Sequence, residues 1–127
     1  MRLPAGVPTE AQEQERVILW WQLYAPHQQL SPHLLWHCPN GGRRDAAEAA
    51  HFARLGVVAG VPDLLLAVAR RGHHGMFVEM KRRLARHRAS DAQLEQIALL
   101  REQGYYTVVC HGADEAIEAI SDYLEVE

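Results

Sequence analysis

The chain has 127 residues, of which 48% are hydrophobic and 23% are charged, and its formal net charge at pH 7 is -3. This length suits one domain with its own core, and this composition excludes a disordered or fibrous protein. The longest apolar stretches, such as Leu64 to Ala69, are too short to cross a bilayer, and the N-terminus lacks the pattern of a signal peptide. We therefore expect a flexible segment over residues 1–8, a single domain over residues 9–127, and a cytoplasmic location.

The first regular element is a helix near the N-terminus. Thr9 and Gln12 have the spacing of a capping box, in which two side chains satisfy backbone N–H groups at the start of a helix. Apolar residues then recur at helical spacing, which predicts an amphipathic helix to about Tyr24. Because proline interrupts the helical hydrogen bonds, we expect Pro26 to end it.

A strand and a second helix follow. The apolar run from Leu34 to Cys38 stops at residues 39–42, whose Pro-Asn-Gly-Gly sequence is a strong turn signal, and it predicts the first strand. Residues 44–55 are rich in alanine and compatible with a helix. Gly56 would close that helix, because glycine readily adopts the left-handed conformation found at helix ends.

Two further strands are predicted in the middle of the chain. Leu64 to Ala69 and Met76 to Lys81 are apolar runs of strand length, and residues 70–75 between them include two glycines. A short connection of this kind favours a hairpin, in which the two strands lie side by side and antiparallel.

The last third of the chain predicts a helix, a strand and a helix. Ser90 and Gln93 form a second capping box, and Gly104 ends the helix that it opens. Tyr105 to Cys110 is rich in β-branched and aromatic residues and predicts a strand, and Ala113 to Leu124 predicts a helix. This order of elements indicates an α/β fold in which helices flank a mixed β-sheet.

Three charged side chains of the predicted hairpin can meet. Side chains alternate along a strand, so Glu79 and Lys81 project from the same face, roughly 7 Å apart. If the chain turns near Gly72, Asp63 lies opposite Lys81 to within a residue or two. Two carboxylates and an ammonium group would then converge at one end of two neighbouring strands.

Such a group of side chains suits metal-assisted hydrolysis. Gly60 can adopt backbone angles that are closed to other residues, and Pro62 fixes the chain just before Asp63, so this segment can present the carboxylate rigidly. Neighbouring carboxylates repel each other, and a hard divalent cation such as Mg²⁺ or Mn²⁺ relieves the repulsion by accepting their oxygens. The cation can polarise a phosphodiester, while Lys81 steadies the attacking water or the developing negative charge.

A simpler interpretation stands beside this one. A Glu-x-Lys tripeptide is often a surface ion pair, and Gly-Val-Pro-Asp can be merely a turn. Glu79 lies within an apolar strand, however, and a buried carboxylate is costly unless it is paired or bound to a metal. The charges are also segregated: residues 64–90 hold seven basic residues and one acid, whereas residues 91–127 hold nine acids and one base. A basic segment around Glu79 suits a phosphate-bearing substrate, although it also suits a solvated loop.

Taken together, the motifs resemble the PD-(D/E)xK nucleases, and in particular their virus-type replication-repair (VRR-NUC) family. The resemblance runs from about Thr9 to Leu124. Its matching pieces are Pro39-Asn40, Leu55 to Leu66 with the Gly60-Val61-Pro62-Asp63 sequence, Phe77 to Lys81 with Glu79-Met80-Lys81, Gln93, and Leu100 with Gly104-Tyr105.

The resemblance implies a restriction-endonuclease-like fold and a defined metal site. It implies that a metal ion is bound by Asp63, Glu79 and the backbone carbonyl of Met80, and that Lys81 is the catalytic lysine. The ion would be Mg²⁺ or Mn²⁺.

A glutamate of the first helix is also implied, reaching the metal directly or through water. Glu10, four residues before Gln14, is the best match to that position, and Glu13 is the alternative. Glu10 is equally explained as an acid that complements the helix dipole. Gln93 is a residue of the active site, as its place in the family suggests, or half of its capping box, or both.

The expected activity is that of a metal-dependent, structure-specific deoxyribonuclease. The resemblance implies branched DNA substrates, such as Holliday junctions or flaps, and stand-alone members resemble dimeric junction resolvases, so a homodimer is expected. A restriction-type or end-processing nuclease and a non-catalytic DNA-binding module remain alternatives. The residues expected to contact DNA are Asn40, Arg43, Arg44, Arg82, Arg83, Arg86 and Arg88.

Overall fold

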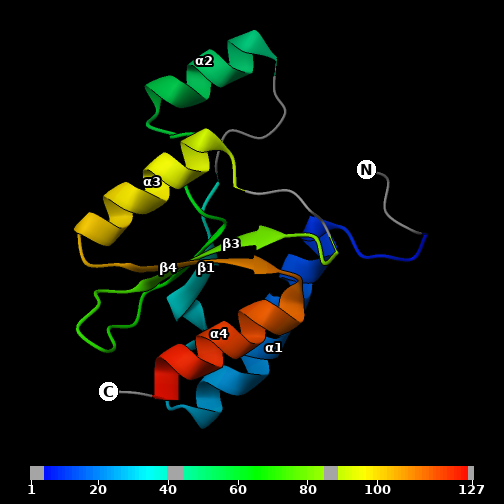
Figure 1. Ribbon diagram of the computed structural model, residues 1–127, viewed down its shortest axis with the longest axis vertical. Coiled ribbons are helices and arrows are strands. Elements are labelled where there is room, and N and C mark those ends of the chain that lie inside the picture. The colour runs from blue at the N-terminus through cyan, green and yellow to red at the C-terminus, as the bar shows by residue number, and fades with distance from the viewer. Residues whose placement is uncertain (1–4, 40–44, 85–88, 126–127) are drawn as a thin grey trace.

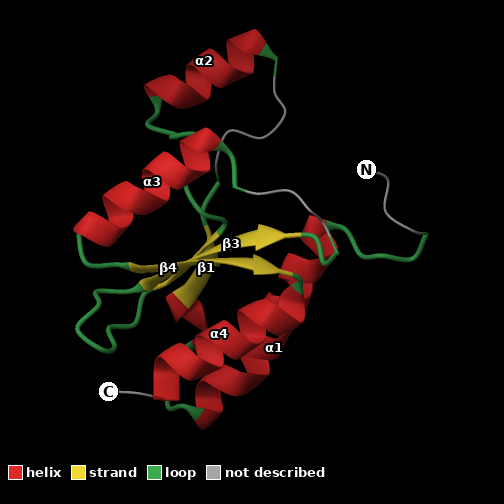
Figure 2. Cartoon of the chain, viewed as in Figure 1, coloured by secondary structure: helices red, strands yellow, loops and turns green. Residues whose placement is uncertain are grey.

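The computed structural model describes residues 5–39, 45–84 and 89–125. A four-stranded sheet lies between helices, with α1 and α4 packed together on one face and α3 on the other (Figures 1 and 2). The helices are α1 (Glu10–His27), η1 (Pro32–Leu34, a 3-10 turn), α2 (Ala46–Arg54), α3 (Asp91–Glu102) and α4 (Ala113–Glu125). The strands are β1 (Leu35–His37), β2 (Leu64–Leu66), β3 (Met76–Lys81) and β4 (Tyr106–His111). Within the described ranges, no helix combines the length and hydrophobicity that a membrane span needs.

The strands are arranged in the order β1-β2-β3-β4. Strand β2 pairs antiparallel with both β1 and β3, and its pairing with β3 is the predicted hairpin. Strands β3 and β4 are parallel, so the sheet is mixed as expected. The central strand β3 has a neighbour on each side and helices over both faces. This position explains why Met76 to Met80 are all buried.

Two elements end three residues from the expected position. Helix α1 continues through Pro26 to His27, because the N–H groups of Gln28 and Gln29 donate to carbonyls of Ala25 and Pro26 and close the last turn around the proline. Strand β2 ends at Leu66 rather than at residue 69. After β2 the Ala67 N–H donates to the carbonyl of Leu34. Leu34 belongs to the 3-10 turn η1, so the regular pairing of β2 with β1 ends there.

The buried face of α1 follows a four-residue spacing. Glu13, Val17, Trp21 and Ala25 lie on this face, and the three apolar members belong to the hydrophobic core. They pack with residues of the sheet and of α4, including Leu64, Leu66, Val78, Ile120 and Tyr123. Glu13 is therefore a carboxylate on a core-facing stripe, only 1% exposed.

A buried hydrogen bond joins α4 to the segment after β2: the Tyr123 hydroxyl donates to the Val68 carbonyl at 2.7 Å. Tyr123→Phe should lower the free energy of unfolding by about 1–2 kcal/mol, because it leaves a buried carbonyl without its partner. Urea denaturation followed by circular dichroism measures this change. The dependence on urea concentration should stay the same, since the ring remains buried, and an unshifted midpoint would contradict the prediction.

Candidate active site

Asp63 is held by contacts to the two strands on either side of β2. Gly60 has a φ of +87°, a conformation that glycine adopts without steric cost, and the buried Pro62 fixes the backbone just before the aspartate. The Asp63 carbonyl accepts a hydrogen bond from the Cys38 N–H at 2.7 Å, and its Oδ2 accepts one from the Met80 N–H at 2.7 Å. The carboxylate is thus fixed against β3.

Glu79 and Lys81 lie on β3 beside Asp63. Leu64 pairs with Val78, so the antiparallel register puts Asp63 opposite Glu79. This is two residues from Lys81, within the expected margin. The Lys81 Nζ lies 3.5 Å from the Glu79 Oε2, and these side chains are 12% and 3% exposed, so the ion pair is shielded from bulk water.

The Glu79 carboxylate is in an unfavourable environment. Its Oε1 is buried without a hydrogen-bond partner among the described residues. Burial, and then the negative charge of Asp63, raise the pKa of Glu79 to about 8, although Lys81 acts in the opposite direction. The site therefore lacks positive charge to match its two carboxylates.

A divalent cation fits this deficiency. Its charge would offset the repulsion between Asp63 and Glu79, and the unpartnered Glu79 oxygen is the kind of ligand that Mg²⁺ or Mn²⁺ prefers. The N–H and C=O of one strand residue point to the same side, so the Met80 carbonyl faces Asp63 as its N–H does. Among the described residues, no group of three or more His, Cys, Asp and Glu side chains could hold a metal. The cation would need backbone oxygen, water or a movable side chain as well.

Gln93 connects the lysine to the glutamate. Its Nε2 donates to the Glu79 Oε2 at 2.8 Å, and its Oε1 accepts from the Lys81 Nζ at 3.0 Å. The same Oε1 accepts from the Ser90 N–H at 2.8 Å, which completes the predicted capping box of α3. The two alternative roles of Gln93 therefore coexist in one side chain, which both caps α3 and contacts the site.

The two glutamates of α1 have different surroundings. Both carboxylate oxygens of Glu13 accept hydrogen bonds from Arg83, at 2.8 and 2.9 Å, and Oε1 also accepts from the Ala113 N–H at the start of α4. The hydrogen bond from Arg83 is the main reason that the pKa of Glu13 is lowered. Glu10 is exposed. Of the two, Glu10 is the carboxylate that is open to a new ligand.

A chain of contacts links the Glu10 side of α1 to Asp63. Gln14 lies one turn after Glu10, and its Nε2 is 3.2 Å from the Nδ1 of His37. The same nitrogen lies 2.9 Å from the Asp63 carbonyl oxygen; when protonated it donates to that carbonyl, and when unprotonated it accepts from Gln14. His37 thus contacts the backbone of Asp63, a role that no local pattern in the sequence indicates.

Two residues expected to bind DNA make contacts within the chain. Arg82 donates to the carbonyls of Val7 and Pro8, and Arg83 binds Glu13. The contact with Arg82 also ties down two residues of the segment that we expected to be flexible. The other expected DNA contacts, Asn40, Arg43, Arg44, Arg86 and Arg88, lie outside the described residues.

Gly60 also lies against the first turn of α3. A Cβ atom at this position would collide with the Ala92 carbonyl and come within 3.0 Å of the Gln93 nitrogen. The loop that carries Asp63 therefore packs directly on the helical turn that carries Gln93. The sequence indicates the need for a flexible backbone at Gly60, but it does not indicate this partner.

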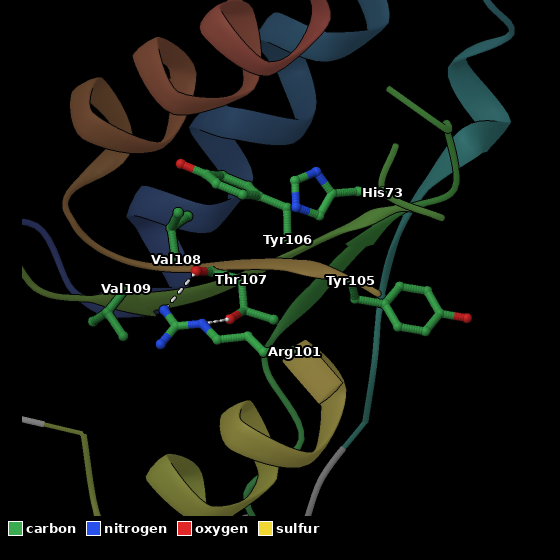
Figure 3. A pocket seen from close by; sticks show the side chains of 7 residues that line it. All are labelled: His73, Arg101, Tyr105, Tyr106, Thr107, Val108 and Val109. Carbon is green, nitrogen blue, oxygen red and sulfur yellow. Dashed lines mark hydrogen bonds between the residues drawn. The ribbon is translucent and has the colours of Figure 1, made fainter. Parts of the chain in front are cut away.

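A cavity of about 590 Å³ lies elsewhere, at the outer edge of β4 (Figure 3). It is lined by His73, Arg101, Tyr105, Tyr106, Thr107, Val108 and Val109, none of them a candidate site residue. Arg101 spans this edge and donates to the hydroxyl and carbonyl oxygens of Thr107. The concentration of charged groups, rather than the size of a cavity, identifies the candidate site.

Comparison with known proteins agrees with the resemblance seen in the sequence. Residues 8–114 match the family model of the VRR-NUC domain. A solved structure described as a VRR-NUC domain protein is similar with a TM-score of 0.77 and 32% sequence identity, over 94% of this chain and 90% of that chain. No curated protein matches the chain. The structural similarity confirms the expected α/β class, and the family match includes every candidate ligand from Glu10 to Glu79.

The raised pKa of Glu79 predicts how stability depends on pH without metal. Between the ordinary pKa of 4.5 and about 8, the folded chain keeps a proton that the unfolded chain has lost. The free energy of unfolding should therefore fall as pH rises through this interval, by at most about 1.4 kcal/mol per pH unit from this group. Urea denaturation in EDTA should show this decline, and Glu79→Gln should reduce it. Equal slopes for the two proteins would contradict the assignment.

The packing of Gly60 predicts a difference between two glycine substitutions. Gly60→Ala and Gly56→Ala both put alanine at positive φ, which costs roughly 1–2 kcal/mol, but a Cβ at Gly56 meets nothing within 4 Å. Only Gly60→Ala must also displace the Ala92 carbonyl, so it should destabilise by about 1–3 kcal/mol more. Urea denaturation compares the two, and equal losses would show that the close approach to α3 has no energetic effect.

Proposed function

Since the chain belongs to the VRR-NUC family of nucleases, we propose that it is a Mg²⁺- or Mn²⁺-dependent endonuclease that hydrolyses phosphodiester bonds in branched DNA. The observation that carries the proposal is the buried Glu79 Oε1, which has no hydrogen-bond partner among the described residues and lies beside a second carboxylate and a lysine. A satisfied structural ion pair would leave no such oxygen.

The residues that would hold the cation are Asp63, Glu79 and the Met80 carbonyl, with Glu10 reaching it directly or through water. When bound, the cation would polarise the phosphodiester and make a coordinated water more acidic. Lys81 carries its charge in a shielded position, where it can orient the attacking water or stabilise charge on the phosphate. Gln93 holds the Lys81 ammonium and the Glu79 carboxylate in fixed relation.

Branched DNA is the proposed substrate because the resemblance to the VRR-NUC family implies it. A homodimer would present two such sites to the two sides of a four-way junction, and this symmetry suits paired cuts. The structure of the DNA, rather than its base sequence, would then determine where the strands are cut.

The test is cleavage of matched junction, flap, nicked and linear duplex DNA with Mg²⁺, Mn²⁺ or EDTA. We expect cation-dependent cuts in the branched substrates, and Asp63→Asn, Glu79→Gln and Lys81→Met should each lower the rate at least about 100-fold. Glu118→Gln, an exposed acid on α4, is the matched control and should cleave normally.

Undiminished cation-dependent cleavage by both carboxylate variants would refute the proposed active site. Cutting of linear duplex at one sequence, or only at ends, would instead indicate a restriction-type or end-processing nuclease. Tight junction binding with no cleavage under any of the cation conditions would indicate a DNA-binding module without catalytic activity.

A further inference from the structure

The two arginines that follow the catalytic strand turn back toward the N-terminus. The Arg82 guanidinium donates through Nη2 to the Val7 carbonyl at 2.6 Å and through Nε to the Pro8 carbonyl at 2.8 Å. These carbonyls belong to the two residues directly before Thr9, the N-cap of α1. Arg82 is thus joined to the chain immediately before α1 begins.

Arg83 is joined to the same helix one turn later. Its guanidinium binds both oxygens of Glu13, whose side chain is 1% exposed and also accepts from the Ala113 N–H. Gly112 leaves room for this arrangement, because a Cβ there would lie 3.1 Å from both the Glu13 Oε2 and the Arg83 Cβ. The paired geometry fixes the orientation of the helix as well as its distance from β3.

Glu10 lies between these two attachments. Val7 and Pro8 precede it, Glu13 follows it, and both attachments lead to residues directly after Lys81. The contact of Gln14 with His37 holds the same side of α1 near Asp63. The position of Glu10 relative to the Asp63 and Glu79 carboxylates therefore depends on these two attachments, which together form a clamp between α1 and β3.

We propose that Arg82 and Arg83 are positioning residues, which clamp the first turn of α1 to the end of β3 so that Glu10 is held ready for the cation. This inference rests on the proposed metal site. It gives the two arginines a role within the chain in place of the phosphate contacts that their charge predicted. Their guanidinium groups suit this role, because the forked donors of arginine bind two acceptors at once.

The test is a double-mutant cycle on Mn²⁺ affinity, measured by electron paramagnetic resonance of free Mn²⁺. Arg82→Ala and Glu10→Gln should each weaken Mn²⁺ binding about 10-fold, as loss of a positioning contact commonly does. In the Glu10→Gln background, Arg82→Ala should have no further effect, because the arginine acts through the glutamate. Arg82→Lys should recover part of the affinity.

Arg16→Ala is the matched control. Arg16 lies on α1 and pairs with Asp114 at the surface. Its loss should therefore leave the Mn²⁺ affinity unchanged. Thermal unfolding of each variant checks that the fold persists. Should Arg82→Ala fail to fold, Arg82→Gln and Arg82→Lys provide the same cycle with smaller changes.

Several outcomes overturn the inference. If Arg82→Ala leaves the Mn²⁺ affinity unchanged, Arg82 does not act through Glu10. The same follows if Arg82→Ala weakens Mn²⁺ binding equally in the wild-type and Glu10→Gln backgrounds. Weaker binding of junction DNA at unchanged Mn²⁺ affinity assigns Arg82 to phosphate contact instead. A wild-type chain that binds no Mn²⁺ overturns the proposed function together with the clamp, whereas normal wild-type binding with an unaffected Arg82→Ala overturns the clamp alone.

Discussion

The hydrogen bond from the Met80 N–H to the Asp63 carboxylate joins the two segments on which the site depends. It uses a backbone donor of the central strand to hold an acidic side chain that lies just before β2. As a result, Asp63 stays beside Glu79 although their charges repel, and Glu79 retains an oxygen that has no hydrogen-bond partner in the described part of the chain. The surrounding core keeps the carboxylates together, and either a proton or a cation can relieve the repulsion.

The side of the site away from the strands is organised by α3. Gln93 uses one amide oxygen both to cap the helix and to receive the Lys81 ammonium, so the lysine is oriented by the same contact that begins the helix. The close approach of Gly60 to the Ala92 carbonyl links this turn to the Asp63 loop. The acidic and basic groups of the site therefore share one rigid support, although they come from distant parts of the chain.

Local signals in the sequence were sufficient for some of this arrangement. The bounds of β3 and the capping box of Ser90 and Gln93 follow from side-chain alternation and capping, which involve only near neighbours. Asp63 lies opposite Glu79, two positions from the expected Lys81. The composition of the connection between the two strands does not determine at which residue the chain turns. The buried position of Glu13 could also have been recognised, since it lies four residues before Val17 on the apolar stripe of α1.

Distant contacts were beyond such signals. The partners of Arg82 lie 74 and 75 residues away, and charge reveals the sign of a suitable partner but not whether it is a phosphate or a carbonyl of the same chain. The contact between His37 and the Asp63 carbonyl likewise depends on the packing of β1 against β2. Sequence patterns therefore indicated which side chains meet at the candidate site better than they indicated what holds them in place.

The arginine at the outer edge of β4 also affects how copies of the chain can meet. A strand with one neighbour exposes backbone groups that can recruit a strand from another molecule, which is a common route to aggregation. In the described sheet, Arg101 engages the Thr107 carbonyl at this edge, so an incoming strand would have to break that bond before it could pair there. Self-association that extends the sheet through β4 is thereby disfavoured, so an assembly formed at this edge would have to rely on side-chain contacts.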